Sequence, residues 1–420
     1  MKQTGRGWIN GFILLMALVA GIGFAASNAD ATNGYFAHGY SIESKALGGA
    51  GVALPQGSVD ASVNPALMAF VGNRADISLS IFNPNREYTV HNSPGFLDPG
   101  TVKSDSKFFV VPGMGVNWIA NNKTTFGISI FGNGGMNTDY DKNTFNGSKP
   151  TGVDLMQLFI VPTLTIKIAP KHSVGISPII AYQSFEAQGL QAFGGFSSSP
   201  KNLTNNGHDS AYGFGARIGY YGELTPYLSI GASYQTKIWT SNYDDYAGLF
   251  AGQGNFEIPA NWTIGIAVKP TPTLVFLFDV QKIYYNDVKS VGNPMIPNLF
   301  KTALGNDEGA GFGWENMTIY KAGVQWKSSD AWTWRAGYSY GEQPIRSRDV
   351  MFNILAPGVP EQHATVGFTR AISKTQDLGF SLMHAFSKTV SGKTPPPFGA
   401  QKVDLKMNQW EGTLGYTWKF

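Results

Sequence analysis

Four basic residues are predicted to share one face of a β-sheet, where they could bind an anionic ligand. Successive side chains of a strand point to opposite sides, and by this alternation one interior face carries Arg217, Lys237, Lys321 and Arg335. A basic side chain beside apolar walls would match the carboxylate of a fatty-acid-like ligand. Two alternatives stay open, because such cations also pair with acidic neighbours or water, and an uncharged hydrocarbon needs no cation.

Apolar residues gather in three segments expected to be long loops. Exposed apolar clusters are costly in water unless they bind something. A groove between loops 189–209 and 241–257 would therefore capture a hydrophobic ligand, although the same side chains would also order the loops by packing on each other. The clusters are Leu190, Phe193 and Phe196, then Tyr246, Leu249 and Phe250, then Met295, Ile296, Leu299 and Phe300.

Catalytic and metal-binding patterns are weak. The triplet His208-Asp209-Ser210 has the residue types of a lipid hydrolase, but it lacks a following Asn-Gly of the kind found in barrel phospholipases. The other five histidines show no metal-ligand spacing, and no phosphate-binding loop is present. We expect no enzyme activity, no metal and no cofactor.

The carboxyl-terminal segment shows which elements position these residues. Trp410, Leu414, Tyr416, Trp418 and Phe420 fall on one face of a strand, and polar residues with Glu411 fall on the other. A strand with lipid on one side and a polar interior on the other needs this alternation. The terminal Phe resembles the closing strand of bacterial outer-membrane barrels, so we expect the barrel-assembly machinery to bind Phe420.

Composition favours the same class of protein. Only 14% of the 420 residues are charged, 13% are aromatic, 51 are Gly and none is Cys, against about 25% charged in ordinary globular chains. The mean hydropathy is −0.11, and no run of about 20 apolar residues follows the leader. A transmembrane barrel fits this balance; a large secreted β-protein is the alternative.

Residues 1–29 are expected to be a signal peptide. Lys2 and Arg6 precede the apolar stretch from Phe12 to Ala20, and small residues allow cleavage after Ala29 or Ala31. Cleavage removes both basic residues, so the mature chain is nearly neutral and offers no charge argument for nucleic acid.

Alternating stretches predict about fourteen antiparallel strands from Arg74 onward, residues 74–420. Six short connections alternate with seven longer ones, as in outer-membrane barrels with short periplasmic turns. The short ones are 120–123, 169–171, 222–226, 269–272, 327–330 and 373–376; the long ones are 91–105, 141–152, 189–209, 241–257, 286–313, 342–361 and 388–403.

Residues 30–73 do not alternate, and we expect them to plug a lumen too wide for barrel side chains to fill. The segment contains Gly48, Gly49, Gly51 and the triplet Asn64, Pro65, Ala66. These residues resemble the hatch of the FadL/TodX-type long-chain fatty-acid and hydrocarbon transporters. In the hatch the resemblance rests on matching motif residues, whereas across the strands it rests on size and layout alone.

The resemblance implies passive uptake of hydrophobic molecules through an outer-membrane barrel. Cargo would pass from the loops to a pocket between hatch and wall, and the Thr32-to-Tyr40 region would then shift. Lateral exit would occur at a kink in the third strand, for which Gly132, Asn133, Gly134 and Gly135 are the candidates. The same glycines would also suit a tight bend facing the plug.

Two other functions are possible for an outer-membrane barrel: a structural or adhesin-type protein, and a water-filled porin. A structural or adhesin-type barrel would not need a Gly-rich plug and a broken strand, and a plug would block a water-filled porin. The expected partners are a fatty acid, alkane or aromatic ligand, outer-membrane lipid and lipopolysaccharide, and no nucleic acid. We expect a monomer in the bacterial outer membrane.

Overall fold

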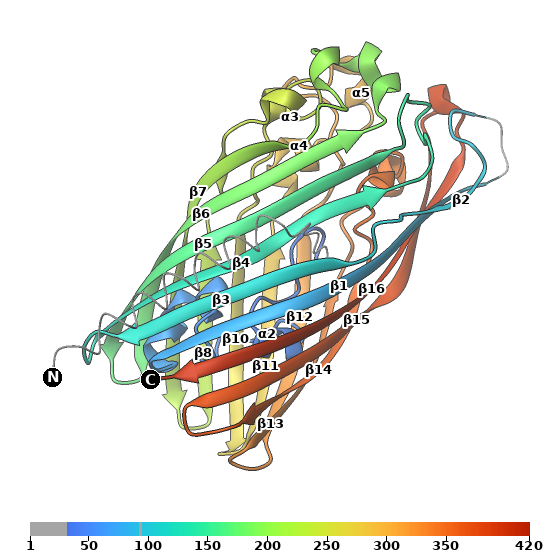
Figure 1. Ribbon diagram of the computed structural model, residues 1–420. Coiled ribbons are helices and arrows are strands. Elements are labelled where there is room, and N and C mark those ends of the chain that lie inside the picture. The colour runs from blue at the N-terminus through green and yellow to red at the C-terminus, as the bar shows by residue number, and fades with distance from the viewer. Residues whose placement is uncertain (1–31, 92–94) are drawn as a thin grey trace.

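The computed structural model describes residues 32–91 and 95–420, which build a closed antiparallel β-barrel around the amino-terminal segment (Figure 1). The expected signal peptide and its cleavage positions lie outside the described residues. Within the described ranges, no helix combines the length and the apolar character that a membrane crossing requires.

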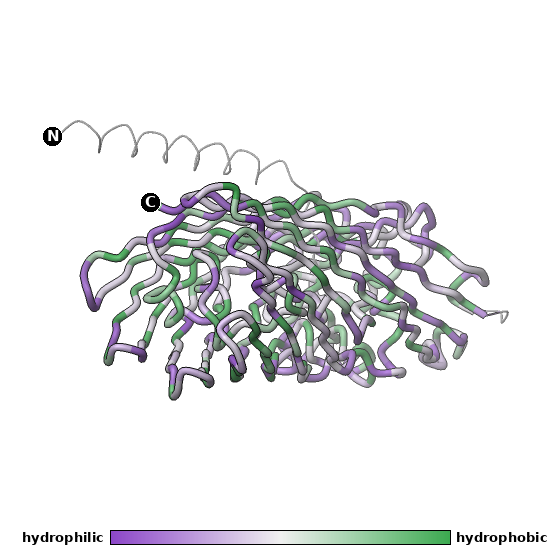
Figure 2. The backbone as a smooth tube through the Cα atoms, turned by 90° about the horizontal axis from the view of Figure 1, so that it is seen from below, coloured by the Kyte–Doolittle hydropathy of each residue, from purple (hydrophilic) through white to green (hydrophobic). Residues whose placement is uncertain are grey.

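The strands follow the alternation of the sequence. In β1, Ile77, Leu79 and Ile81 are exposed, whereas Ser80 and Phe82 between and beyond them are buried. Viewed from below, hydrophobic and hydrophilic residues alternate along the wall (Figure 2). The strands are β1 (Arg74–Val90), β2 (Gly100–Lys103), β3 (Phe109–Ile119), β4 (Thr124–Asp139), β5 (Gly152–Ala169), β6 (His172–Gln188), β7 (Asp209–Thr225), β8 (Leu228–Gln235), β9 (Trp239–Thr240), β10 (Asn261–Thr271), β11 (Leu274–Ile283), β12 (Met317–Lys327), β13 (Trp332–Gly341), β14 (Gln362–Ala371), β15 (Gln376–Lys393) and β16 (Lys402–Lys419).

The ring formed by the described residues contains fourteen strands, as predicted, once the short β2 and β9 are set aside. Each strand pairs antiparallel with its neighbour, and β16 closes the ring against β1 from Arg74↔Lys419 to Val90↔Val403. Closure leaves no strand edge without a partner strand at this seam, which a lipid environment requires.

Helical turns lie in the amino-terminal segment and in the long loops at one end of the barrel (Figure 1). The segment holds α2 (Ile42–Ala46), η1 (Asp60–Ser62) and η2 (Pro65–Phe70). The loops hold η3 (Gln191–Phe196), η4 (Pro200–Asn202), η5 (Asp244–Tyr246), α3 (Ala251–Gly254), η6 (Tyr285–Asp287), α4 (Lys289–Gly292), α5 (Asn298–Lys301), η7 (Ser347–Asp349), η8 (Phe352–Ile354) and η9 (Pro396–Phe398).

Three predicted connections were wrong in extent. The turn predicted at 222–226 lies later, since β7 continues to Thr225 and β8 begins at Leu228. The loop predicted at 388–403 is shorter, because β15 continues to Lys393 after a register shift between Ala385 and Lys388 that breaks the alternation. The turn predicted at 269–272 lies later, since β10 ends at Thr271 and β11 begins at Leu274.

Candidate functional site

An apolar cavity lies beneath the long loops, and four of the predicted ligand-binding residues line it. Leu190, Phe193, Leu249 and Phe250 come together there. This loop cavity has further walls that the sequence analysis missed, although the apolar residues Phe352, Ile354 and Leu355 in one loop were a usable signal. The missed residues are Val153, Phe185, Leu203, Ser290, Leu304, Ala310, Gly311, Phe312, Phe352 and Leu355. Phe196 does not line the cavity and packs instead against Phe300 and Phe398.

The loop cavity is small. It offers about 40 Å³, whereas an apolar cavity that accepts benzene measures about 150 Å³. A ligand must therefore spread the loops as it enters. The side chains of Leu190, Phe193 and Phe250 are buried here. If the loops spread, the same side chains would contact the ligand.

A row of buried aromatic rings leads from the loop cavity toward the barrel wall. Phe250 in the cavity lies 4.9 Å from Phe256, and Phe256 lies 5.9 Å from Tyr35, measured between ring centroids. Tyr35 is 5.4 Å from Phe36 and 5.8 Å from Trp314. These distances are those of packed aromatic pairs. The aromatic row, Phe250-Phe256-Tyr35-Phe36, is thus a continuous series of packed rings.

The wall is interrupted where the row ends. β3 and β4 pair from Ile119↔Thr125 to Gly113↔Phe131, and main-chain bonding between the two sides resumes where the Asp105 N–H donates to the Asp139 carbonyl over 2.8 Å. Between residues 106–112 and 132–138, the described chain has no β3–β4 pairing. We call this interruption the ladder gap.

The candidate kink residues lie at the edge of the ladder gap. Gly132 faces Leu158 and Gly134 faces Gln157, so Asn133 is an extra residue that bulges from β4. A bulge bends its strand and increases the local twist. The inward side chains switch from Phe131 before the bulge to Met136 after it, which directs β4 away from β3.

Residues Tyr35–Ala37 of the amino-terminal segment cover the half of the ladder gap that lies away from the long loops. Phe36 bridges to Gly134, the Ala37 N–H donates to the Asn133 carbonyl, and the Gly135 N–H donates to the Tyr35 carbonyl, both over 3.0 Å. A Cβ at position 134 would lie 1.7 Å from the Tyr35 carbonyl oxygen. The backbones approach this closely because residue 134 is glycine.

The motif residues fold the amino-terminal segment on itself at Gly49 and bond it to the wall at Asn64. Gly49 has φ +83°, and a Cβ there would lie 1.9 Å from the His38 carbonyl oxygen. The Asn64 amide donates to the carbonyls of Val52 and Tyr220, on β7, over 2.8 and 2.9 Å. The Asn64 Oδ1 also accepts from the Ala66 N–H, capping the short helix that Pro65 begins.

Buried carboxylates of the wall hold the segment at other points. Asp279 accepts from the N–H groups of Gly51 and Val52 over 2.8 and 2.9 Å. Glu411 pairs with Lys45, which also donates to the Ser80 hydroxyl over 2.8 Å. Charged hydrogen bonds of this kind are stronger than neutral ones.

His38 stands next to the Lys45–Glu411 pair, and its Nδ1 lies 3.4 Å from the Glu411 carboxylate. Burial lowers the pKa of His38 to about 4, with Lys45 and Lys321 adding repulsion that the Glu411 charge opposes. His38 is therefore neutral at pH 7, and Lys45 is left as the cation that matches Glu411.

We predict that acidification loosens the amino-terminal segment through His38. Undocked His38, with an ordinary pKa of about 6.5, binds a proton more readily than docked His38, so docking weakens as the pH falls from about 6.5 toward 4. The effect is at most about 3 kcal/mol. Channel conductance in planar bilayers should rise below pH 6 in the parent protein and less in His38→Gln. Equal acid responses in the two proteins would contradict this prediction.

The four predicted lumen cations do not gather at the loop cavity. Lys321 donates to the Gly49 carbonyl over 3.3 Å, and Arg335 donates to the side chains of Gln56 and Gln325 over 3.1 and 2.8 Å. Arg217 is buried beside Gln235, to which it donates. Two of these cations thus contact the amino-terminal segment.

Lys237 was wrongly placed by strand phase. β8 ends at Gln235, and the Thr236 N–H donates to the Ala216 carbonyl, which breaks the alternation. Ile238 takes the inward position and is fully buried, and Lys237 pairs with Glu257 over 2.5 Å.

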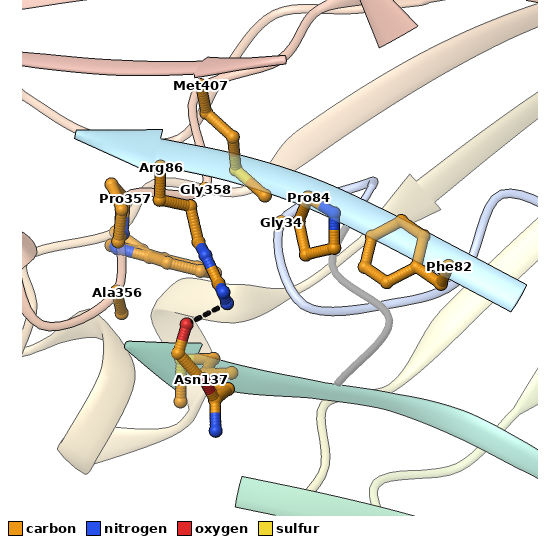
Figure 3. A pocket seen from close by; sticks show the side chains of 11 residues that line it. Gly34, Phe82, Pro84, Arg86, Asn137, Ala356, Pro357, Gly358 and Met407 are labelled. Atoms are coloured by element: carbon orange, nitrogen blue, oxygen red, sulfur yellow. Dashed lines mark hydrogen bonds between the residues drawn. The ribbon is translucent and has the colours of Figure 1, made fainter. Parts of the chain in front are cut away.

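A smaller cavity that sequence reasoning missed lies beside the ladder gap. Arg86 of β1, Met136, Asn137 and Trp314 are among the residues that line it. Figure 3 shows Arg86 and Asn137 facing one another across it. Arg86 continues the inward phase of Ser80 and Phe82 along β1. Extending that phase to the end of the strand would have found it.

The triplet at 208–210 forms no nucleophile–base pair. His208 contacts the carboxylates of Asp154 and Glu186 at 3.1 and 3.2 Å, whereas the Ser210 hydroxyl bonds to that of Tyr182. A base must instead reach the nucleophile.

Comparison with known proteins points to transport rather than catalysis. The family described as outer membrane protein transport protein (OMPP1/FadL/TodX) matches residues 18–420. A search of the curated proteins found no match.

Several solved structures share the fold. The Pseudomonas putida toluene transporter TodX is 19% identical, with a TM-score of 0.68 over 91% of this chain and 99% of that chain. A Pseudomonas aeruginosa FadL homologue is 17% identical, with a TM-score of 0.71 over 92% and 100%. The Ralstonia pickettii toluene transporter TbuX is 19% identical, with a TM-score of 0.63 over 91% and 99%.

Proposed function

The chain belongs to the OMPP1/FadL/TodX family of outer-membrane transport proteins, and on that premise we propose that it takes up hydrophobic molecules by passive lateral transport. Cargo enters the loop cavity from outside, follows the aromatic row, and leaves sideways through the ladder gap into the membrane. The amino-terminal segment of residues 30–73 serves as the hatch that closes the lumen to water.

The single observation that carries this proposal is the joining of the aromatic row to the ladder gap. Phe36 is the last ring of the row and also the residue that bridges to Gly134. A hydrophobic molecule that displaces Phe36 from the wall would at once meet an opening without strand pairing. An adhesin would gain nothing from this connection.

The walls favour an uncharged cargo, or the uncharged part of a larger one. Among the described residues lining the loop cavity, Ser290 is the one polar side chain and none is basic. Arg217, Lys237, Lys321 and Arg335 are engaged elsewhere. Two similar structures are those of toluene transporters, which supports aromatic hydrocarbons as first cargo to try beside fatty acids.

Deletion of Asn133 is the direct test. The deletion removes the extra residue and leaves Phe131 and Met136 facing inward, since the pairing of Gly132 with Leu158 and of Gly134 with Gln157 then becomes regular. We expect β4 to extend its pairing with β3 and close the ladder gap. Uptake of radiolabelled naphthalene or oleate by cells should fall at least tenfold.

Asn133→Ala is the matched control, because it removes the Asn133 side chain with its bonds to Gln157 and Tyr40 but keeps the bulge. It should retain most of the uptake. A folded deletion variant that transports like the parent would overturn the lateral route. Failure of the parent to take up either cargo would overturn the assignment of cargo and favour a structural barrel.

Assembly and oligomeric state are proposals of the same kind. Phe420 ends the chain with an exposed ring, and its N–H donates to the Asn73 carbonyl over 3.2 Å. We infer that the barrel-assembly machinery binds this terminal strand and that the barrel works as a monomer among outer-membrane lipids and lipopolysaccharide.

A further inference from the structure

Arg86 spans the ladder gap at its long-loop end. From β1, its Nη1 donates to the carbonyl of Asn137 on β4, as Figure 3 shows. Its Nη2 donates to the carbonyl of Ser106, which precedes β3. Asn137 and Ser106 belong to opposite sides of the gap. One side chain therefore connects two stretches of backbone that the strands do not pair.

The charge of Arg86 is buried, and the carboxylates of Asp139 and Asp154 attract it only from beyond ion-pair distance. The residue is 5% exposed, and within the described ranges it forms no ion pair and its Nε has no hydrogen-bond partner. Its guanidinium lies 5.5 Å from the centre of the Phe109 ring. Burying an unpaired charge is costly, so an apolar side chain of similar length would be the cheaper way to fill this space.

The Arg86 guanidinium lies between the aromatic row and the ladder gap, where it can block passage from one to the other. The small cavity lined by Arg86 also touches Trp314 and Gly34, next to the aromatic row, and Met136 of β4. Arg86 thus stands where the row meets the long-loop half of the ladder gap. Tyr35–Ala37 covers the other half, near Asn133–Gly135.

We propose that Arg86 is a latch that closes the long-loop half of the ladder gap by holding Asn137 and Ser106 together. The main-chain carbonyls that lack a strand partner receive their donors from the guanidinium. The latch opens when the guanidinium releases one carbonyl, and this release limits the rate of lateral exit. The inference rests on the lateral route proposed above.

The chain has no Cys, so a single introduced thiol can report on the latch. Met136→Cys places that thiol in the small cavity, at a position only 3% exposed. In proteoliposomes, a lipid-soluble maleimide should label this thiol at least tenfold faster after Arg86→Met. Arg86→Lys, which cannot donate to both carbonyls with the same fork, should give an intermediate rate.

Initial uptake of naphthalene should rise about threefold in Arg86→Met, whereas loss of a merely structural contact would not accelerate transport. Arg348→Met, which makes the same change on a half-exposed loop arginine, is the matched control and should leave labelling unchanged. All variants are first compared for the heat-dependent gel mobility of a folded barrel, and Arg86→Lys carries the test if Arg86→Met does not fold.

Two results would overturn the latch. Labelling of Met136→Cys at the parent rate in both Arg86 variants would show that the gap is closed without Arg86. Unchanged labelling with a selective loss of oleate uptake would instead make Arg86 a residue that binds carboxylate. Because labelling needs no cargo, a failed latch is distinguishable from a failed lateral route, which the Asn133 deletion tests separately.

Discussion

Replacing Gly134 with valine (Gly134→Val) is expected to expel Tyr35–Ala37 from the ladder gap. The new Cβ would stand 1.7 Å from the Tyr35 carbonyl oxygen, about half the separation of touching heavy atoms. Either β4 or the amino-terminal segment must move. β4 is paired along β5 from Thr124 to Asp139, whereas the segment holds this site through two main-chain bonds. The segment should therefore yield.

A thiol at Ala37 measures this displacement. Ala37 is buried in the parent, so Ala37→Cys should react slowly with maleimide, and the rate should rise at least tenfold in the presence of Gly134→Val. Gly412→Val is the matched control, because a Cβ on that strand glycine meets no atom within 4 Å. Equal labelling in the Gly134 and Gly412 variants would mean that the segment does not cover the gap.

Tyr35–Ala37 and Arg86 close different halves of the ladder gap, and thiol labelling should distinguish their effects. Gly134→Val acts on Tyr35–Ala37 and leaves Arg86 with its two carbonyls. Arg86→Met should speed labelling at position 136 with little effect at position 37, and Gly134→Val should favour position 37.

The barrel could be predicted from the sequence because each strand is marked by the alternation of its own residues. In each strand the side that faces lipid is set by a period of two, and lipid demands apolar residues there with little tolerance. Phe276 and Phe278, for example, needed only their spacing to be placed outside. The loop cavity was partly predictable for a related reason, since apolar residues such as Phe193 and Leu249 are costly in a loop unless they are buried.

Features that depend on a change of phase or on long-range partners could not be read in this way. Lys237 was misplaced because the alternation breaks after Gln235, and a period of two carries no signal of its own interruption. The sequence also indicated that Lys321 and Arg335 face inward, but their partners are a carbonyl and an amide of the amino-terminal segment. Which backbone groups need a donor is known only once that segment is placed.

Lys45→Met is expected to have the largest effect on closure of the lumen. Lys45 and Glu411 are both buried, and His38 beside them is neutral at pH 7 because burial lowers its pKa to about 4. Removing Lys45 therefore leaves Glu411 charged without a matched cation, which costs about 3–5 kcal/mol. Docking of the amino-terminal segment bears this cost, and the channel should open to ions, measured as conductance in planar bilayers.

Lys406→Met makes the same chemical change in a pair that is half-exposed on the lysine side, with Glu87 at 3.0 Å. Such a pair is worth about 0–1 kcal/mol, so this control should stay closed.

The double variant Lys45→Met/Glu411→Met decides whether the charge or the contact matters. Replacing a buried ion pair by apolar residues of similar size is often close to neutral, whereas removing one partner is not. If the uncompensated Glu411 charge drives opening, the double variant should be closed, and the coupling between the two sites should recover most of the lost free energy. If the Lys45 stem and its bond to Ser80 hold the segment instead, the double variant should conduct as freely as Lys45→Met.

The pH dependence of conductance should distinguish the same two explanations. If the uncompensated Glu411 charge drives opening, protonation of His38 in Lys45→Met would supply the missing cation beside Glu411. That variant should then conduct less at pH 5 than at pH 7, opposite to the parent.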